Sequence, residues 1–306
     1  MTSVLYKRLD LQSFFEPIFY VTSTSYRVFW GYLLLSAMIA AYILYQNKHS
    51  LISAVRFLCS KRLWKHPSFL LDFKLIFMNH ALWVLFIIPW LGSQVSFALY
   101  VSRTLRHYLG TGDFIHFDTL SINIIYTFLL FIIDDLSRFI VHKCYHTIPW
   151  LWRFHAVHHS AKVMTPFTLY RVHIIEMFIN ALRSILVFGG IGGIAIYMVD
   201  GRINTLTILG SSIFSLLFNI AGANLRHSHV WFSFGILEKW IISPAQHQIH
   251  HSVDPQHYNK NYGVMLAVWD KLSDTWLASK DQSVEEFGID TPVEQSLKSH
   301  ILGIKM

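Results

Sequence analysis

The chain has 306 residues, of which 53% are hydrophobic and only 14% are charged, and its mean hydropathy is +0.41. This composition is too apolar for an ordinary soluble domain of this length and is typical of a membrane protein. The formal net charge of +7 comes largely from basic residues beside the apolar runs. No basic tract with interleaved aromatic residues stands out, so we exclude a nucleic-acid-binding protein.

Five apolar runs predict membrane-spanning helices, because a helix needs about 17 to 25 mainly apolar residues to cross a bilayer. In chain order they cover residues 28–45, 75–92, 120–133, 178–199 and 205–223. The third run is short, and its continuation through Asp134 and Arg138 predicts a helix that leaves the membrane before its first histidine, His142. We therefore expect an all-α integral membrane bundle with about four or five transmembrane helices.

The distribution of lysine and arginine predicts the orientation, because short loops rich in these residues stay in the cytoplasm. The segments between runs one and two and between runs three and four hold most of the basic residues, whereas the opposite loops hold only Arg103, Arg106 and Arg202. Runs four and five form a hairpin, so the segments on either side of it share one face. We expect that face to be cytoplasmic and the N-terminus to lie outside. The bacterial inner membrane is the favoured location, or the endoplasmic reticulum if the chain is eukaryotic.

Twelve of the eighteen histidines fall between His142 and His257, and eight of them form three clusters that read HKCYH, HAVHH and HQIHH. Residues three and four positions apart share a helix face, so each cluster directs two or three imidazoles at one place. This is metal-ligand spacing, and eight histidines are enough to hold two cations that each keep an open position. The eight candidate ligands are His142, His146, His155, His158, His159, His247, His250 and His251.

Helix-start signals place the clusters on helices. Thr147 and Pro149 predict a new helix after the first cluster, with the second cluster on its second and third turns. Ser243 and Gln246 resemble a capping box, with Pro244 at the first helical position, directly before the third cluster. We predict a cytoplasmic helical cap in which all three clusters meet around a histidine-rich dimetal site.

Five residues outside the clusters are further candidates. His227 and His229 do not share a helix face, so we expect His227 to bind metal and His229 to support a ligand. Asn224 lies one turn before His227 and is either an amide ligand or a structural residue. His173 and His257 are either ligands or supporting residues.

Two carboxylates are expected to hold imidazoles in place rather than to bind metal. Asp135 lies two turns before His142 on the same helix face, where it would accept a hydrogen bond from that imidazole and fix its tautomer. An ion pair with Arg138 is the alternative. Glu176 lies one turn after His173, and we expect it to orient that ring or to cap the following span.

The residues alone leave other classes of metal protein open. Imidazole also suits zinc, but a zinc hydrolase needs a general base and the HExxH motif is absent. A metal transporter or a bis-histidine haem protein would hold its ligands near the middle of the membrane, whereas these histidines lie outside the apolar runs. The Glu-x-x-His pattern of soluble di-iron bundles is also absent.

The order HxxxH, HxxHH, HxxHH resembles the fatty acid hydroxylase/sterol desaturase superfamily of membrane di-iron oxygenases. The resemblance covers about residues 135–276 and includes Asp135 seven residues before His142. It extends to the motifs WRFHAVHHS, RVHIIE and NYGVMLAVWDKL. The chain departs from the family at Lys143, where arginine is frequent, at Ile174, where proline is frequent, and at SDT (273–275), where a related branch has FGT. These departures spare the histidines and leave the subfamily open.

The resemblance implies two iron ions, with O2 as co-substrate, and attack on an unactivated C–H bond of a membrane lipid. Hydroxylation is the first expectation and desaturation the second. Zinc is an expected substitute for iron in the isolated protein. Two electrons must arrive in each turnover, and the sequence has no cytochrome b5, Rossmann or iron–sulfur motif. We therefore expect a separate electron donor of the cytochrome b5, ferredoxin or reductase type.

The sequence predicts one structural domain with three regions. Residues 1–118 form a transmembrane and interfacial region, and residues 119–278 form the catalytic region. Residues 279–306 form a polar C-terminal tail, which we expect to be solvated and without a chemical role.

Overall fold

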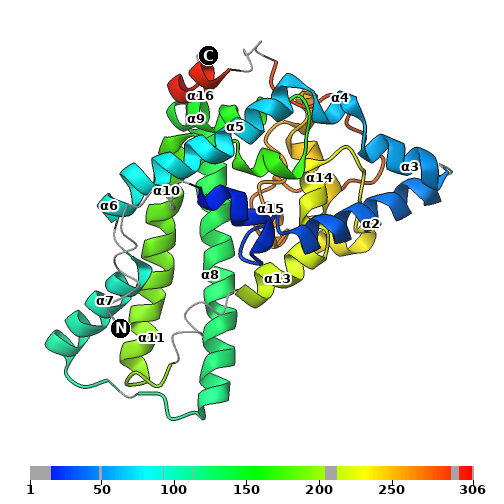
Figure 1. Ribbon diagram of the computed structural model, residues 1–306. Helices are drawn as coiled ribbons and strands as arrows, with labels where there is room; N and C mark the ends of the chain where they lie inside the picture. Colours follow the sequence, from blue (N-terminus) through cyan, green and yellow to red (C-terminus); the bar gives the residue numbers. More distant parts are fainter. Residues whose placement is uncertain are drawn as a thin grey trace.

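A computed structural model describes residues 15–47, 50–91, 93–112, 114–203, 212–290 and 296–304. Regular secondary structure within these ranges is helical, apart from two isolated bridges, Ile241 with Leu266 and Ser252 with Phe287. Figure 1 shows long helices that extend away from a denser group of helices and loops. The expected all-α fold is confirmed.

The N-terminal third forms helices separated by short turns, several of them capped by serine. Ser50, Ser60 and Ser93 each accept a hydrogen bond from a first-turn backbone N–H, which satisfies a donor that the helix itself cannot. The elements are η1 (Glu16–Thr22), α2 (Trp30–Gln46), α3 (Leu51–Leu58), α4 (Lys61–Trp64), α5 (Pro67–Leu82), η2 (Trp83–Ile87), α6 (Ile88–Leu91) and α7 (Gln94–Leu109).

The middle of the chain contains the longest helix, α8 (Thr119–Thr147), which is capped by Asp118. It is followed by α9 (Pro149–His159), whose first residue is the expected proline. A short helix, η3 (Pro166–Tyr170), then leads to a continuous helical stretch made of α10 (Ile174–Ser184), η4 (Ile185–Gly189) and α11 (Gly190–Met198). The apolar third run thus continues into the first histidine cluster as one helix, as expected.

Short elements form the remainder of the chain. The expected capping box is present at α14, where Ser243 and Gln246 satisfy each other's backbone N–H groups. The elements are α13 (Ser212–Ile220), η5 (Ala223–His227), η6 (Gly235–Lys239), α14 (Pro244–His250), η7 (Pro255–His257), α15 (Val268–Leu272) and α16 (Leu297–Leu302).

Helices α7, α8 and α10–α11 extend away from the short elements, and α7 packs along α11 (Figure 1). Glycine allows the close approach of these two helices. A Cβ atom at Gly193 would lie 2.6 Å from the Ala98 carbonyl oxygen, and one at Gly189 would lie 2.8 Å from the Phe97 ring. Larger residues at either glycine would therefore force α7 away from the continuous stretch of η4 and α11.

Two of the described helical stretches are long and apolar enough to cross a membrane, Pro67–Ile87 and Ile174–Met198. They correspond to the second and fourth expected runs, although the second begins eight residues earlier than expected. The first run is the shorter apolar helix Trp30–Gln46, and the fifth lies partly in residues 204–211, outside the described ranges. The number of spans therefore stays a prediction.

The C-terminal tail is not the solvated appendage that the sequence suggested. Phe287, His300 and Ile304 are buried, and the Gly288 backbone N–H donates to the His251 carbonyl oxygen. The tail is polar overall but carries enough apolar side chains to pack against α9, where Ile304 joins a cluster with Ala156. It thus covers the histidine-bearing elements.

Candidate metal centre

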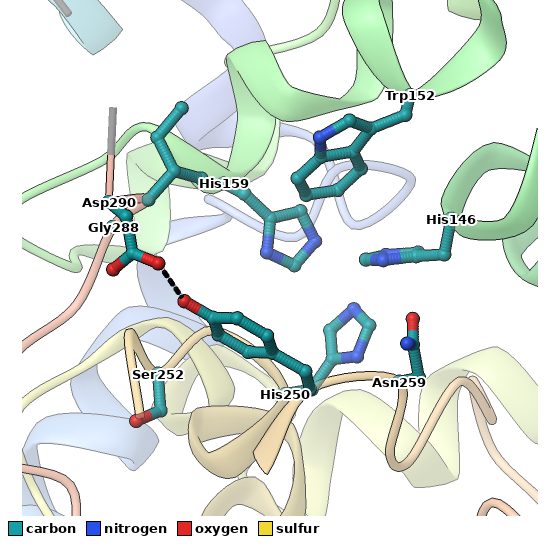
Figure 2. Close-up of a pocket in the computed structure, with 10 residues that line it drawn as sticks. His146, Trp152, His159, His250, Ser252, Asn259, Gly288 and Asp290 are labelled. Carbon is teal, nitrogen blue, oxygen red and sulfur yellow. Dashed lines mark hydrogen bonds between the residues drawn. The ribbon is translucent and has the colours of Figure 1, made fainter. Parts of the chain in front are cut away.

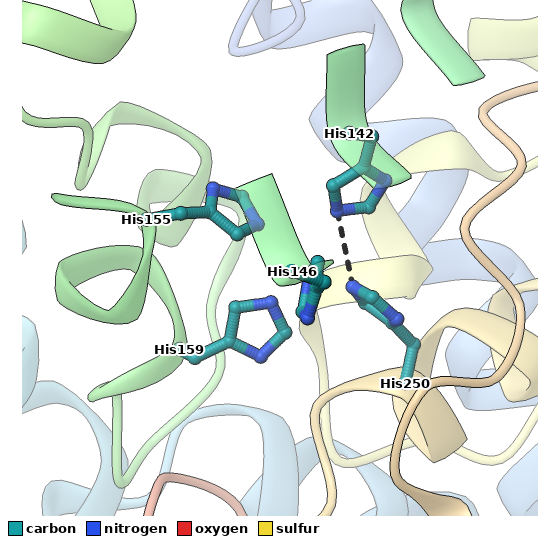
Figure 3. Close-up of side chains that lie close together, drawn as sticks. All are labelled: His142, His146, His155, His159 and His250. Carbon is teal, nitrogen blue, oxygen red and sulfur yellow. Dashed lines mark hydrogen bonds between the residues drawn. The ribbon is translucent and has the colours of Figure 1, made fainter. Parts of the chain in front are cut away.

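The structure brings together the nine histidines expected to bind metal, in two adjoining groups. In each group every ring contributes one nitrogen atom, and these nitrogen atoms all lie within 4.8 Å of one another. The first group contains His142, His146, His155, His159 and His250, and Figure 3 shows these rings converging from α8, α9 and α14. The second group contains His158, His227, His247 and His251.

Helix geometry explains how each HxxHH motif serves both groups. Positions i and i+4 lie about 40° apart around an α-helix, whereas i+3 and i+4 lie about 100° apart. On α9, His155 and His159 therefore join the first group while His158 points to the second. The third cluster, on α14 and its C-cap, shows the reverse pattern. His250 joins the first group, while His247 and His251 join the second. The two motifs interlock across the boundary, where the His159 and His251 rings stack at 4.3 Å.

The hydrogen bonds of four rings orient their other nitrogen towards the centre. A carbonyl or carboxylate oxygen can only accept, so each of these Nδ1 atoms carries the proton and leaves the Nε2 lone pair free for a metal. The bonds run from His142 to the Tyr262 carbonyl (2.7 Å), from His155 to Glu176 (3.1 Å), from His158 to the Arg171 carbonyl (3.3 Å) and from His250 to the Lys260 carbonyl (2.8 Å).

The nitrogens that point towards the centre lie close together and have few hydrogen-bond partners. A bound cation would accept their lone pairs. The Nε2 atoms of His142 and His250 lie 3.1 Å apart, and those of His227 and His247 also lie 3.1 Å apart. Other inward nitrogens are buried without a hydrogen-bond partner among the described residues, and leaving such groups unpaired costs about 1–3 kcal/mol each. These orphaned atoms are Nε2 of His146, His155 and His159. The residues therefore fit a pair of metal ions.

Burial makes these imidazoles neutral at physiological pH. It lowers the pKa of every ring in both groups below the ordinary histidine value, because the low-polarity surroundings disfavour the charged form. The pKa of His155 falls to about 3 and that of His158 to about 4. Neutral imidazole is the form that binds metal, so the site favours cations without competition from protons.

His247 differs from the other rings in what its Nδ1 atom faces. The partner is the Arg226 guanidinium, whose Nη2 lies 3.1 Å away and can only donate. Arg226 also donates to the carbonyl oxygens of Gly263 and Val264, so it ties the third cluster to the following loop.

Asp135 does not contact the imidazole of His142, contrary to expectation. Its carboxylate accepts hydrogen bonds from the backbone N–H groups of Met265 and Leu266 and from the Trp269 indole, at 2.9 to 3.0 Å. Asp135, on α8, instead holds the loop that contains Met265 and Leu266. The carbonyl oxygen of Tyr262 in this loop accepts the hydrogen bond from His142. No ion pair with Arg138 forms, because Arg138 pairs with Asp134 at 2.8 Å.

Glu176 orients a different ring from the one expected. It accepts from His155 Nδ1, whereas His173 caps α10 by accepting from the Ile175 N–H and donates to the Ile301 carbonyl. His155 lies 21 residues earlier in the chain, so the pairing depends on how α9 packs against α10. Local spacing alone could not indicate it.

The remaining candidates lie outside both histidine groups or serve other contacts. His229 accepts from the Met164 N–H at 3.2 Å, and His257 donates to Gln282 at 3.1 Å. Asn224 donates its amide to the Arg27 carbonyl at 2.8 Å. None of His173, His229 and His257 belongs to the two groups, so this geometry does not support His173 or His257 as a metal ligand, in agreement with the non-ligand role expected for His229.

A buried ion pair that sequence reasoning missed fixes the segment after α9. Arg171 and Asp72 are both fully buried, and Arg171 Nε lies 2.5 Å from Asp72 Oδ1. Arg171 also donates to Ser68 and Ser160, while Thr168 donates to the other Asp72 oxygen. These contacts join α5 to Arg171, whose backbone carbonyl oxygen accepts the hydrogen bond from His158. Its only sequence signal is a pair of charges inside apolar stretches, 99 residues apart.

Two cavities reach the histidines. The tail cavity, of about 370 Å³, is bounded by Trp152 and by residues of the C-terminal tail and touches His146, His159 and His250 (Figure 2). Tyr258 donates to Asp290 across it. The arginine cavity, of about 310 Å³, touches rings of both groups and is lined by Arg27, Arg138, Arg183 and Arg226.

Comparison with known proteins places this geometry in a family. The model of the fatty acid hydroxylase family matches residues 127–275, which contain all nine histidines. This region belongs to the fatty acid hydroxylase family. The resemblance read from the histidine motifs is thereby confirmed, and the family region extends from the third turn of α8 to the loop after α15.

Several curated proteins are about a quarter identical to this chain over the residues that align. Ornithine lipid hydroxylase OlsE of Rhizobium tropici is 26% identical over 56% of this chain and 47% of its own length. Alkylglycerol monooxygenase of Danio rerio is 25% identical over 63% of this chain and 39% of its own. Human cholesterol 25-hydroxylase is 27% identical over 50% of each. The chain thus spans half or less of these relatives, and no solved structure matches it.

Proposed function

We propose that this chain is a membrane-bound di-iron oxygenase that hydroxylates an unactivated C–H bond of a lipid. The observation that carries the proposal is the convergence of nine neutral imidazoles into two adjoining groups. The reaction takes one O2, two electrons and two protons, and it yields one hydroxyl group on the lipid and one water. We assign the electrons to a separate donor of the cytochrome b5, ferredoxin or reductase type.

Iron is proposed because the family is one of oxygen-using hydroxylases, whereas imidazole alone would also suit zinc. When bound, two iron ions would supply the activation of O2 that no side chain can provide. The five-histidine and four-histidine groups would hold one ion each. The protein's own contribution is to fix several of the rings through their Nδ1 bonds and to keep most of the rings buried away from bulk water.

Hydroxylation is preferred over desaturation because of the relatives. The relatives from Rhizobium tropici, Danio rerio and human are each named a hydroxylase or a monooxygenase. Their lipids are an ornithine lipid, an alkylglycerol and cholesterol by those names, so the relatives support a lipid substrate without selecting one. Desaturation on the same site is the alternative that the experiment below separates.

The surface of α8 supports a membrane location. Leu120, Ile124 and Phe128 in its first half are more than half exposed, which is costly in water and favourable in lipid. The histidines lie at the other end of this helix, beside α9 and α14 (Figure 1). With the basic-residue bias of the loops, this supports a centre at the cytoplasmic surface of a bacterial inner membrane or, in a eukaryote, of the endoplasmic reticulum.

Lipid extracts provide the decisive test. Cells that express the intact chain should contain a lipid heavier by one oxygen atom than its counterpart in cells that express His158→Ala, because that change removes a ring from the four-histidine group. His107→Ala, at an exposed histidine outside the site, is the matched control and should keep the product. A lipid that has lost two hydrogens would indicate desaturation, and protein reconstituted with zinc instead of iron should yield no product. The proposal fails if extracts from intact and His158→Ala cells are identical.

A further inference from the structure

The arginine cavity carries more positive charge than its own carboxylates balance. Four arginines line it, with Glu176 as its one carboxylate, and the Glu176 side chain accepts from the His155 ring. Arg138 and Arg183 share one carboxylate, because Asp134 forms ion pairs with both, at 2.8 and 2.6 Å, so one of their two positive charges is balanced. Arg27 and Arg226 form no ion pair with a described residue, so they contribute most of the charge that is left unbalanced.

Within the described residues, neither Arg27 nor Arg226 has a carboxylate within 4.0 Å. Arg27 donates to the Ala223 carbonyl oxygen at 3.2 Å, and Arg226 donates to backbone carbonyls and to His247. Both guanidinium groups lie over the ring of Phe218, at 5.5 and 5.3 Å from its centre. The Nε atom of each arginine is buried without a hydrogen-bond partner among the described residues. Arg226 as a whole is only 3% exposed, and Arg27 is partly buried.

Neither guanidinium group forms an ion pair with a described residue, and only the more distant charges of Asp135 and Asp270 favour the charged form of Arg226. Two neighbouring guanidinium groups placed in this way are unfavourable, since each loses hydration and both carry the same charge. An anion in the cavity would remove this cost. Guanidinium matches carboxylate and phosphate in particular, because its fork of N–H donors fits two oxygens of either group. Metal binding by the histidines would not relieve it, because a metal adds further positive charge beside Arg226.

We propose that Arg27 and Arg226 bind the anionic headgroup, a phosphate or a carboxylate, of the lipid that enters the arginine cavity. This inference rests on the proposed function for the identity of that lipid as substrate. Asn180 and Arg183 also line the cavity, and both belong to Ile174–Met198, one of the two candidate spans. A lipid in the surrounding membrane thus has a route to the cavity along this helix.

The same cavity touches His142 and His155 of one histidine group and His158, His227 and His247 of the other. A headgroup held by the arginines would therefore lie within one small cavity of about 310 Å³ together with the metal-binding rings. The oxidised carbon is then in the headgroup or close to it, and not at the far end of a long acyl chain.

The test measures lipid binding directly, without turnover. The purified full-length chain in a neutral detergent is titrated with phosphatidic acid, oleic acid, neutral diacylglycerol and inorganic phosphate, and bound ligand is counted by native mass spectrometry. We expect one acidic lipid to bind at least about tenfold more tightly than diacylglycerol, the size of one or two charge-assisted hydrogen bonds. Arg27→Gln should lose that preference and Arg27→Lys should restore part of it. Arg62→Gln, at an exposed arginine outside the cavity, should keep it.

Each outcome decides for or against the inference. Preference for phosphatidic acid identifies phosphate as the ligand group, and preference for oleic acid identifies carboxylate. Equal binding of acidic and neutral lipids, or an equal loss in Arg27→Gln and Arg62→Gln, overturns the inference. The inference is also overturned if inorganic phosphate binds in a way that depends on Arg27 but neither acidic lipid binds. If acidic lipid binds but no oxygen is inserted, the proposed function fails while this site stands. Thermal unfolding of each variant shows whether a loss of binding reflects misfolding.

Discussion

Single side chains in this protein act mainly by fixing the orientation of other side chains. The imidazole rings are held through their Nδ1 atoms, and in three of the four cases the acceptor is a backbone carbonyl that no substitution can remove. Glu176 is the exception, because it is a side-chain acceptor for His155. It is therefore the residue at which the support of a ring can be tested cleanly.

Glu176→Leu should weaken metal binding by roughly 10- to 100-fold, because it removes the group that holds the His155 ring and its tautomer. Glu176→Gln should lose much less, since its amide oxygen can still accept the same hydrogen bond. Iron content of the purified variants, measured at increasing chelator concentration, reads the effect without any enzymatic assay. Equal iron retention in the Leu and Gln variants would contradict the assigned role.

The sequence predicted residue roles well where they depend on local geometry and poorly where they depend on packing. Motif spacing placed the histidines on shared helix faces, and the capping box before α14 formed as expected. The partners of Asp135 and Glu176 were wrong, because their true partners lie 130 and 21 residues away. Arg171 and Asp72 were missed for the same reason.

Among the elements, α16 is held by contacts that respond to pH. His300 is buried and donates to the Val172 carbonyl at 3.1 Å, while the Ile301 carbonyl accepts from His173. Burial, with the nearby positive potential of His173 and Arg171, lowers the pKa of His300 to about 3. Once α16 detaches, this ring returns to the ordinary value of about 6.5.

Docking of α16 should therefore weaken as the pH falls below about 6.5. In that range the detached segment binds a proton that the docked one does not, so docking loses up to about 1.4 kcal/mol per pH unit from this group. Hydrogen exchange of residues 297–302 should be faster at pH 5.5 than at pH 7.5, after correction for intrinsic rates. His300→Gln should flatten the difference, whereas His107→Gln should not. A pH-independent exchange rate in the wild-type segment would disprove the assignment.

At the scale of the whole molecule, the candidate metal centre joins parts of the chain that are otherwise far apart. Its rings come from α8, α9, η5 and α14, and all lie within the family region. Composition and apolar runs predicted the helical class, whereas the membrane face on which the clusters meet stays a prediction. They could not predict the span count, because an apolar helix, α5, here buries the charge of Asp72 against Arg171 of a connecting segment.

Removal of metal should lower the melting temperature of the entire protein, because a ligand that binds only the folded state adds its binding free energy to stability. Differential scanning fluorimetry of iron-loaded protein, with and without chelator, measures this directly. His158→Ala should show a smaller shift than the wild type, as one of its two groups is incomplete. An unchanged melting temperature after complete removal of iron would contradict a structural contribution from the centre.

The interlocked HxxHH motifs have a consequence for how the centre is assembled. α9 and α14 each supply rings to both groups. Binding of one ion therefore aligns the two helices that also carry ligands of the other ion. We expect uptake to be cooperative, with few molecules that carry a single ion at intermediate iron concentrations. The angle between successive residues of an ordinary α-helix would then be the reason that the protein binds two ions rather than one.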